Sequence, residues 1–479
     1  MKGCMVLMAA IAVHMAAAHV SAAELWIGAA EADITPIEPV ALDGQFNLRV
    51  AQKADTPITA NVLVLESREG GRSIDAAVMV SCDLVTISDI MFDNVRRAAQ
   101  KRLPDFDSQK LFLNATHTHT APVTRLGGYD IPGEGVMQPE AYCAFAAARI
   151  AEVIERAWKG RTPGGFTWGL GHAAVAENRR AVYADGRAVM YGKTNRPDFR
   201  GLEGYEDHDI GTLFFWDKTG TLIALAVNVS CPSQEVEGRS SLNADFWHPV
   251  REMIHKRYGP DVCVLGWTGA AGDQSPHVMY RQNAEERMRQ LRKLTRLEEL
   301  ARRIVGAVDE TFEAVKNDRH ADVPFIHKVE MLQLPMRLVT DAEYAEVKAA
   351  IAKEKPSQMR ERWYKEILTR YEKQKTDPNP LCKTTSIHVL RIGDVAICTN
   401  PFELFVDYGV QMKARSPAVQ TFVIQLANCG EGRFGYLATE RAVRGGGYSA
   451  IVQSNQVGPE GGQMLVEHTL SAIQTVFRK

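Results

Sequence analysis

The stretch Leu111-Phe-Leu-Asn-Ala-Thr-His117-Thr-His119-Thr-Ala-Pro122 joins an apolar run to two histidines two residues apart. The apolar run has the length and composition of a β-strand. Because side chains alternate along an extended chain, both imidazoles point to the same side. Neutral imidazole is a common ligand for zinc-like metals, so the stretch predicts the beginning of a metal site at the carboxyl end of a strand. Alone, the H-x-H spacing fits a structural role equally well.

Other runs rich in apolar and β-branched residues recur along the chain, and each has the length of a strand. Segments with helical periodicity lie between them. This alternation predicts an α/β fold of mixed sheets layered with helices. The predicted strands are Ala76–Val80, Lys110–Asn114, Leu222–Val229, Val262–Leu265, Val395–Ile397 and Thr421–Ala427, and the predicted helices include Ile90–Arg102, Tyr142–Trp158 and Trp247–Arg257.

The chain after its first segment, residues 23–479, predicts one catalytic domain, because it contains no repeat and no low-complexity linker. A helical excursion at about 283–377 stands apart within it. Apolar residues from Leu291 to Ile304 recur there at helical spacing among charged residues. Thr340 and Glu343 have the spacing of a capping box and predict the start of another helix.

The amino-terminal segment has the features of a secretory signal peptide. Lys2 precedes an apolar stretch through Ala18, and Val20-Ser-Ala22 supplies the small residues that a signal peptidase accepts. Residues 1–22 therefore predict a signal peptide and a secreted or periplasmic protein. The alternative is a short membrane anchor, although histidines interrupt the run and a bilayer span needs about 20 apolar residues. We expect no integral membrane segment after signal removal.

The charge and the cysteine content limit the kinds of binding partner and of stabilising framework that we expect. The 479 residues include 56 Lys and Arg against 58 Asp and Glu, which gives a formal charge of −2 without a long run of one sign. Nucleic acid is therefore not an expected partner. One of the 8 cysteines, Cys4, belongs to the predicted signal, and the odd number that remains lacks the spacing of a disulfide framework. At least one thiol is expected to be free or metal-bound.

Polar clusters follow several of the predicted strands. Open α/β sheets gather their binding sites just beyond the carboxyl ends of strands, so these clusters predict one shared pocket. They are Cys231-Pro-Ser-Gln234, Gly272-Asp-Gln-Ser275-Pro276, Glu403, and the stretch from Asn428 to Tyr436.

Taken in order along nearly the whole mature chain, the motifs resemble the catalytic domain of the neutral, non-lysosomal ceramidases. Familiar members of that family carry an immunoglobulin-like domain after the catalytic part. We expect none here, because the chain ends in a predicted final helix, Met464–Phe477. The motifs that carry the resemblance are Gly28-Ala-Ala-Glu-Ala-Asp33-Ile-Thr-Pro36, the HTH segment, Ser241-Leu-Asn-Ala-Asp245, Gly272-Asp-Gln-Ser-Pro276, Asn400-Pro-Phe-Glu403, Tyr436 and Tyr448-Ser-Ala.

The resemblance implies one zinc ion (Zn2+) per chain, which that family holds with two histidines, a glutamate and a tyrosine and uses to activate a water that cleaves the amide of a ceramide. Carried over by motif, His117, Glu403 and Tyr436 are implied metal ligands. His119 is similar to a nearby histidine that contacts the substrate or the developing oxyanion, to which Tyr436 could also donate. Ser275 falls on the serine of the G-D-x-S-P loop and is implied as a hydrogen-bonding residue beside the substrate, not a nucleophile.

The second histidine ligand is where this sequence departs from the family. The His-Pro of the family reads here as Cys231-Pro232, with Asp245 at the same separation of 14 residues. A thiolate is a good zinc ligand, so Cys231 becomes the implied metal ligand. Two alternatives stay open: His248, three residues beyond Asp245, replaces the missing ligand, or the metal is lost.

Three further residues are candidate substrate contacts. Asn178 and Arg179 resemble an Asn-Arg element near the family's pocket, and Gln234 belongs to one of the polar clusters. The resemblance implies an exported, zinc-dependent hydrolase of ceramide-like N-acyl lipids, with a small molecule or lipid as substrate. The alternatives are the same fold and metal acting on a carbohydrate or ester, and a metal-free binding protein. A long apolar groove favours an acyl chain, whereas a pocket with several Asp, Arg and Trp side chains favours a sugar.

Overall fold

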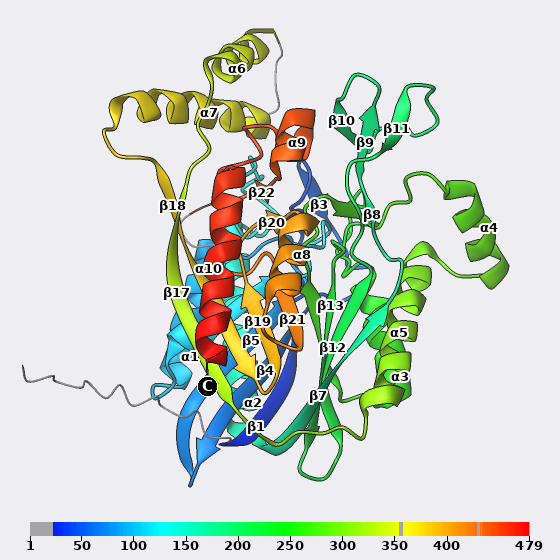
Figure 1. Cartoon of the computed structure of the whole chain (residues 1–479), viewed down its shortest axis with the longest axis vertical. Coiled ribbons are helices and arrows are strands. Elements are labelled where there is room, and N and C mark those ends of the chain that lie inside the picture. Colours follow the sequence, from blue (N-terminus) through cyan, green and yellow to red (C-terminus); the bar gives the residue numbers. More distant parts are fainter. Residues whose placement is uncertain (1–22, 354–357, 429–431, 433, 479) are drawn as a thin grey trace, which may run out of the picture.

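The computed structural model describes residues 23–353, 358–428, 432 and 434–478. The predicted signal peptide, residues 1–22, lies outside the described residues, as does Cys429. Two β-sheets pack together between layers of helices (Figure 1). Within the described ranges, no helix is long and apolar enough to cross a membrane.

The larger sheet is mixed and has the strand order β14-β13-β12-β7-β1-β4-β5-β6, with β16 paired to β1. The pairs β5–β6 and β13–β14 are parallel. Its strands are β1 (Ala23–Asp33), β4 (Thr59–Glu69), β5 (Arg72–Cys82), β6 (Leu111–Ala115), β7 (Thr162–His172), β12 (Asp209–Asp217), β13 (Leu222–Val229), β14 (Cys263–Thr268) and β16 (Asp322–Val323).

The second sheet has the order β17-β18-β19-β21, and its β19–β21 pair is parallel. Its strands are β17 (Phe325–Pro335), β18 (Cys382–Ile392), β19 (Val395–Thr399) and β21 (Gln420–Ile424). Short strands form the remaining pairings: β2 (Val40–Leu42) with β3 (Arg49–Ala51), β8 (Glu177–Asn178) with β15 (Gln274–Ser275), β20 (Glu403–Leu404) with β22 (Tyr436–Leu437), and β9 (Arg180–Tyr183) between β10 (Ala188–Met190) and β11 (Phe199–Leu202).

Strand β4 shows why the layers form. Val62 and Val64 point to one side and pack with α1 and α2, whereas Leu63 and Leu65 point to the other side, into the core between the two sheets. The outer face of the second sheet is covered by α8 and α10 (Figure 1). The predicted α/β fold of mixed sheets layered with helices is confirmed. The helices named here are α1 (Asp89–Arg102), α2 (Pro139–Gly160), α8 (Val406–Arg415) and α10 (Pro459–Phe477).

The segment predicted as a helical excursion has two parts with different surroundings. In α5 the side chains of Leu300, Ile304 and Val308 pack with β12–β14 and α3, so this helix is a layer of the core. The helices α6 and α7 lie beyond the ends of the sheets (Figure 1). The predicted capping box is confirmed: Thr340 N donates to Glu343 Oε2 at 2.9 Å and Glu343 N donates to Thr340 Oγ1 at 3.2 Å. The helices are α3 (Trp247–Tyr258), α4 (Gln282–Arg292), α5 (Arg296–Val315), α6 (Asp341–Lys353), α7 (Gln358–Thr376) and α9 (Glu440–Gly445).

Two buried histidines tie the second sheet to the first. His327 Nδ1 donates to the carbonyl of Ala76 at 3.0 Å, and its Nε2 lies 2.9 Å from His388 Nδ1. His388 Nε2 in turn lies 3.0 Å from Asn428 Nδ2, whose side-chain oxygen accepts from Leu113 N at 2.9 Å. Each ring therefore carries one proton and accepts one hydrogen bond, which is the arrangement of two neutral imidazoles. Burial, Lys110 and Arg96 lower the pKa of His388 to about 3, and burial also lowers the pKa of His327.

This pair should make folding stability sensitive to acid. The folded-state pKa values lie below the unfolded value of about 6.5, so below that pH the unfolded chain binds protons that the folded chain does not, and stability decreases as the pH is lowered. We expect His388→Gln to be less stable than the wild type near neutral pH but to lose less stability on acidification. The slope should differ by about 1.4 kcal/mol per pH unit between about pH 6 and pH 4, measured by urea denaturation.

The control is His172→Gln, because the side chain of His172 is 67% exposed. Its acid sensitivity should match the wild type. Equal slopes for wild type and His388→Gln would contradict the neutral pair.

Candidate active site

A cavity of 560 Å³ collects four of the residues predicted from the sequence. His117 and His119 reach it from the loop after β6, and Glu403 and Tyr436 reach it from the paired strands β20 and β22. The β2–β3 loop and α7 supply other parts of its wall. The predicted shared pocket beyond strand ends therefore brings these four side chains together.

The backbone fixes the orientation of His117. This residue has a positive φ of 67°, an uncommon conformation that turns the chain sharply after β6. Its Nδ1 donates to the carbonyl of Val85 at 2.7 Å, so in the neutral ring Nε2 carries a lone pair. Nε2 lies 3.4 Å from Glu403 Oε2. A carbonyl behind one nitrogen is the usual way to aim the other nitrogen of a metal-binding histidine.

Glu403 and Tyr436 are direct partners in the parallel β20–β22 pair. Glu403 N donates to Gly435 O at 3.0 Å, which fixes this register. Burial alone would raise the pKa of Glu403, but hydrogen bonding and charge from His117 in its protonated form, with the charge of Arg179, lower it to about 2. Burial and the neighbouring Glu403 raise the pKa of Tyr436. The pair thus presents an ionised carboxylate beside a protonated phenol.

His119 completes a cluster that is short of positive charge. Its Nε2 lies 3.2 Å from His117 Nε2, and its Nδ1 lies 3.3 Å from Glu237 Oε2 without hydrogen-bonding alignment. A neutral ring has one N–H, so one lone pair of His119 faces either His117 or Glu237 in both tautomers. One more proton or a cation between these groups removes the mismatch.

Behind Tyr436 lies a buried polar network around Arg179. Its Nη2 donates to the Tyr436 hydroxyl at 3.1 Å and to Gly272 O at 2.8 Å, and its Nη1 lies 3.3 Å from Gln234 Oε1. The pKa of Arg179 is raised, because the neighbouring Tyr436, Tyr191 and Glu403 outweigh the opposing effect of burial. The guanidinium therefore stays charged against Tyr436.

The other predicted polar residues join this network and not the cavity wall. Asn178 Nδ2 donates to Asp273 Oδ2 at 2.8 Å, and Ser275 Oγ lies 3.1 Å from the Tyr191 hydroxyl. The cavity is lined by none of Asn178, Arg179, Gln234 and Ser275. Their roles beside a substrate stay predictions.

Comparison with known proteins identifies the architecture. No family model matches the sequence, and no curated protein matches it. The neutral ceramidase from Pseudomonas aeruginosa superposes with a TM-score of 0.68 at 18% identity, over 95% of this chain and 76% of that one. A second structure, a ceramidase complexed with C2, gives a TM-score of 0.67 at 16% identity over the same shares. The chain has the neutral ceramidase fold. The fold that the sequence resemblance implied is therefore confirmed.

Cys231 sits at the point where the sequence departs from the neutral ceramidase pattern. Its loop runs beside the His117 loop, because Ser233 N lies 3.3 Å from Thr116 O. The thiol, however, is buried in the apolar cluster of α3 and α5 and contacts the carbonyl of Pro232 at 3.6 Å. Burial and Asp245 raise the pKa of Cys231, which favours the thiol over the thiolate. The cavity is lined by neither Cys231 nor His248. Cys231 as a metal ligand stays a prediction.

Sequence reasoning missed Glu237 and the aromatic wall of the cavity. Glu237 lies three residues after Gln234, and its nearness to that polar cluster was the available signal. Phe46, Trp363 and Tyr448 come from distant segments, with ring centroids 5.7 Å apart for Phe46–Trp363 and 6.0 Å for Trp363–Tyr448. No local pattern links these three residues.

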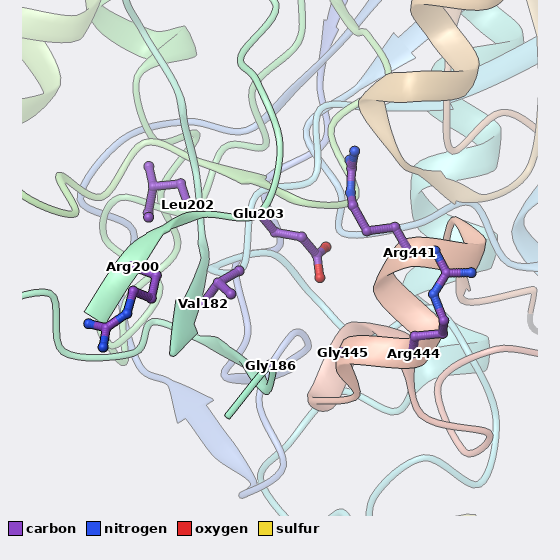
Figure 2. A pocket seen from close by; sticks show the side chains of 9 residues that line it. Val182, Gly186, Arg200, Leu202, Glu203, Arg441, Arg444 and Gly445 are labelled. Atoms are coloured by element: carbon purple, nitrogen blue, oxygen red, sulfur yellow. The ribbon is translucent and has the colours of Figure 1, made fainter. Parts of the chain in front are cut away.

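A second hollow, of 450 Å³, lies between β11 and α9. Figure 2 shows Arg441 and Arg444 projecting from α9 near Glu203. Glu203 pairs with the buried Arg180 at 2.6 Å, and Arg441 and Arg444 pair with Asp407 and Glu440. Arg200, which also lines the hollow, donates to the carbonyl oxygens of Pro197 and Phe199. The lining residues of this hollow form no cluster of nucleophilic or metal-binding side chains.

Gly44 allows a strong test of how tightly His119 is held. A Cβ on Gly44 would lie 2.6 Å from His119 Cγ. This ring atom is bonded directly to the Cβ of His119, so it has little freedom to move away. Its φ of +94° also disfavours other residues. We expect Gly44→Ala to lose stability from both backbone strain and overlap, with the overlap contributing about 1–3 kcal/mol, measured by urea denaturation.

Gly135→Ala is the matched control. Gly135 has a φ of +71° and open space around its Cβ position, so only the backbone strain applies. Equal losses in the two variants would show that the His119 ring yields freely.

Proposed function

We propose that the protein is an exported hydrolase that cleaves the amide bond of N-acyl compounds with the help of one bound zinc ion, and that ceramide-like lipids are the first substrates to test. The observation that carries this proposal is the convergence of His117, Glu403 and Tyr436, with His119 beside them, on one cavity of a neutral ceramidase fold. Export rests on the predicted signal peptide, residues 1–22.

The donor chemistry of the cluster fits a divalent cation. An imidazole nitrogen, a carboxylate oxygen and a phenol oxygen are available from His117, Glu403 and Tyr436, and the His119 environment lacks one positive charge. Among the described residues, no group of three or more His, Cys, Asp and Glu side chains is arranged to hold a metal. The proposed set therefore depends on Tyr436 as its third member, with Cys231 as the predicted fourth.

The residues around this set have distinct tasks. A bound divalent cation supplies a water of lowered pKa and polarises a carbonyl group. His119 is placed to accept a proton from an attacking water and return it to the leaving nitrogen. Arg179 holds the Tyr436 hydroxyl and keeps a positive charge close to where the oxyanion develops. Burial lowers the pKa of His119, and Glu237, which lies against its far nitrogen, opposes this effect without reversing it.

A second candidate keeps this chemistry but changes the substrate to a carbohydrate or carbohydrate ester. It is favoured by the cavity lining, which includes Asp43, Arg125, Arg362, Trp363 and Glu366. Charged and aromatic side chains of this kind suit polar, hydroxylated groups better than a hydrocarbon chain.

Elemental analysis and hydrolysis assays test the proposal together. We expect about one zinc per chain in the purified protein, and loss of amide hydrolysis on chelation with recovery when zinc is returned. His117→Ala and Glu403→Gln should weaken zinc binding by about tenfold or more, because each removes a ligand. Tyr436→Phe should lower kcat.

Cys231→Ser decides the predicted fourth ligand. Unchanged zinc content in this variant would show that the thiol is not a ligand, and loss of zinc would show that it is. A native protein that binds no zinc after soaking and cleaves no amide would overturn the proposal in favour of a metal-free binding protein.

A further inference from the structure

A charged pair on the cavity wall has no task in the chemistry described above. Arg125 Nη2 donates to Asp43 Oδ1 at 2.7 Å, and both residues line the cavity. Gly44 N donates to the same oxygen of Asp43 at 2.8 Å. The Tyr129 hydroxyl lies 3.1 Å from that oxygen and 2.5 Å from the carbonyl oxygen of Gln45. The carboxylate is thus held by Arg125 and Gly44 N, with Tyr129 beside it.

Both members of the pair keep unused polar atoms. Among the described residues, Asp43 Oδ2 accepts no hydrogen bond, and Arg125 Nη1 and the buried Arg125 Nε donate none. The carboxylate is ionised: burial opposes this, but Arg125, Gly44 N and Tyr129 together lower the pKa of Asp43. The wall therefore presents one free acceptor and one free donor side by side.

The pair is rigidly connected to the catalytic loop. Arg49 Nη2 donates to the carbonyl oxygens of both Asp43 and His119, at 2.6 Å and 2.7 Å. Gly44, directly after Asp43, packs so closely on the His119 ring that a Cβ does not fit. A group bound by the pair consequently lies at a fixed position relative to His119.

Aromatic rings form another part of the same cavity. Phe46, Trp363 and Tyr448 pack on one another, and Tyr448 packs edge-on against Tyr436 at 5.7 Å. Arg362 of α7 holds this wall in place, because it donates to Gly127 O and pairs with Asp130 at 2.8 Å. The cavity thus combines flat apolar rings with a donor and an acceptor.

We propose that Asp43 and Arg125 bind hydroxyl groups of the substrate, and that the substrate is a compact, hydroxyl-rich, N-acylated compound of the carbohydrate type. This rests on the proposed amide hydrolysis. Hydroxyl groups both donate and accept, so neighbouring hydroxyls satisfy Oδ2 and Nη1 together. A hydrocarbon chain in the same place removes water from two charged groups and returns no hydrogen bond, which is unfavourable. The aromatic rings offer surfaces for the C–H faces of a sugar ring.

Substrate competition tests this specificity. Three amides with the same acyl chain are compared: an N-acyl hexosamine, a ceramide and an N-acyl alkylamine without hydroxyls. We expect the wild type to prefer the hexosamide, and Asp43→Asn to reduce the hexosamide-to-alkylamide ratio of kcat/KM about tenfold or more, mainly through KM. Preference for the ceramide, or an unchanged ratio in Asp43→Asn, would overturn the inference.

Two variants guard against a folding artefact. Glu66→Gln removes a carboxylate from another buried arginine pair, in which Glu66 Oε2 lies 2.5 Å from Arg161 Nε outside the cavity, and its ratio should match the wild type. Arg125→Gln should reduce the ratio as Asp43→Asn does. It takes the place of Asp43→Asn in the test if that variant does not fold.

Calorimetric titration with the N-acyl hexosamide separates this inference from the proposed function. Binding that Asp43→Asn weakens, with no hydrolysis of any amide, would sustain the inference and reject the hydrolase. Hydrolysis of amides with no binding preference for the hexosamide would reject the inference and sustain the hydrolase.

Discussion

The ionised carboxylate of Glu403, buried beside His117 and Tyr436, is the constraint around which the site is built. A buried charge is costly unless it is paired and hydrogen-bonded. Here the compensation comes from the charge of Arg179 beyond Tyr436 and from His117 when its ring is protonated. Glu403 lies more than 200 positions from both His117 and Arg179 in the chain, so the site exists only when the layers around it are assembled. The same need for positive charge makes the cluster a suitable place for a cation.

The sheets bring these loops together through polar contacts at the ends of their strands. Thr268 Oγ1 donates to Ala115 O at 3.1 Å, and Gln425 N donates to Thr268 O at 2.9 Å. Asn428 reaches Leu113 N and His388 from its position just after β21. The contacts of Thr268 link strand ends, and Asn428 connects the segment after β21 to the middle of β6 and β18, so the apolar packing between the sheets also sets the distances within the site.

Much of this arrangement was predictable because it depends on local pattern. The runs Leu222–Val229 and Val395–Ile397 fall in β13 and β19, since a buried strand needs apolar residues on both faces. His117, Glu403 and Tyr436 were found through the motifs of the family resemblance, which follow predicted strands, and all three line the cavity. The orientation of the Cys231 side chain was not predictable, since a turn after β13 decides it. Phe46, Trp363 and Tyr448 meet only through tertiary packing, which no sequence window contains.

The residues that the sequence predicts and those that it does not predict lie in different parts of the cavity. The floor of the cavity is made by strand ends, and these are fixed by the packing of the sheets that defines the neutral ceramidase fold. Its walls are made by the β2–β3 loop, the loop that carries Arg125, and α7, which lies beyond the sheets (Figure 1). Loops outside a core change without disturbing it. In the function proposed here, the part of the cavity set by the shared fold holds the reacting groups, and the walls with Asp43, Arg125 and Trp363 select the molecule that enters.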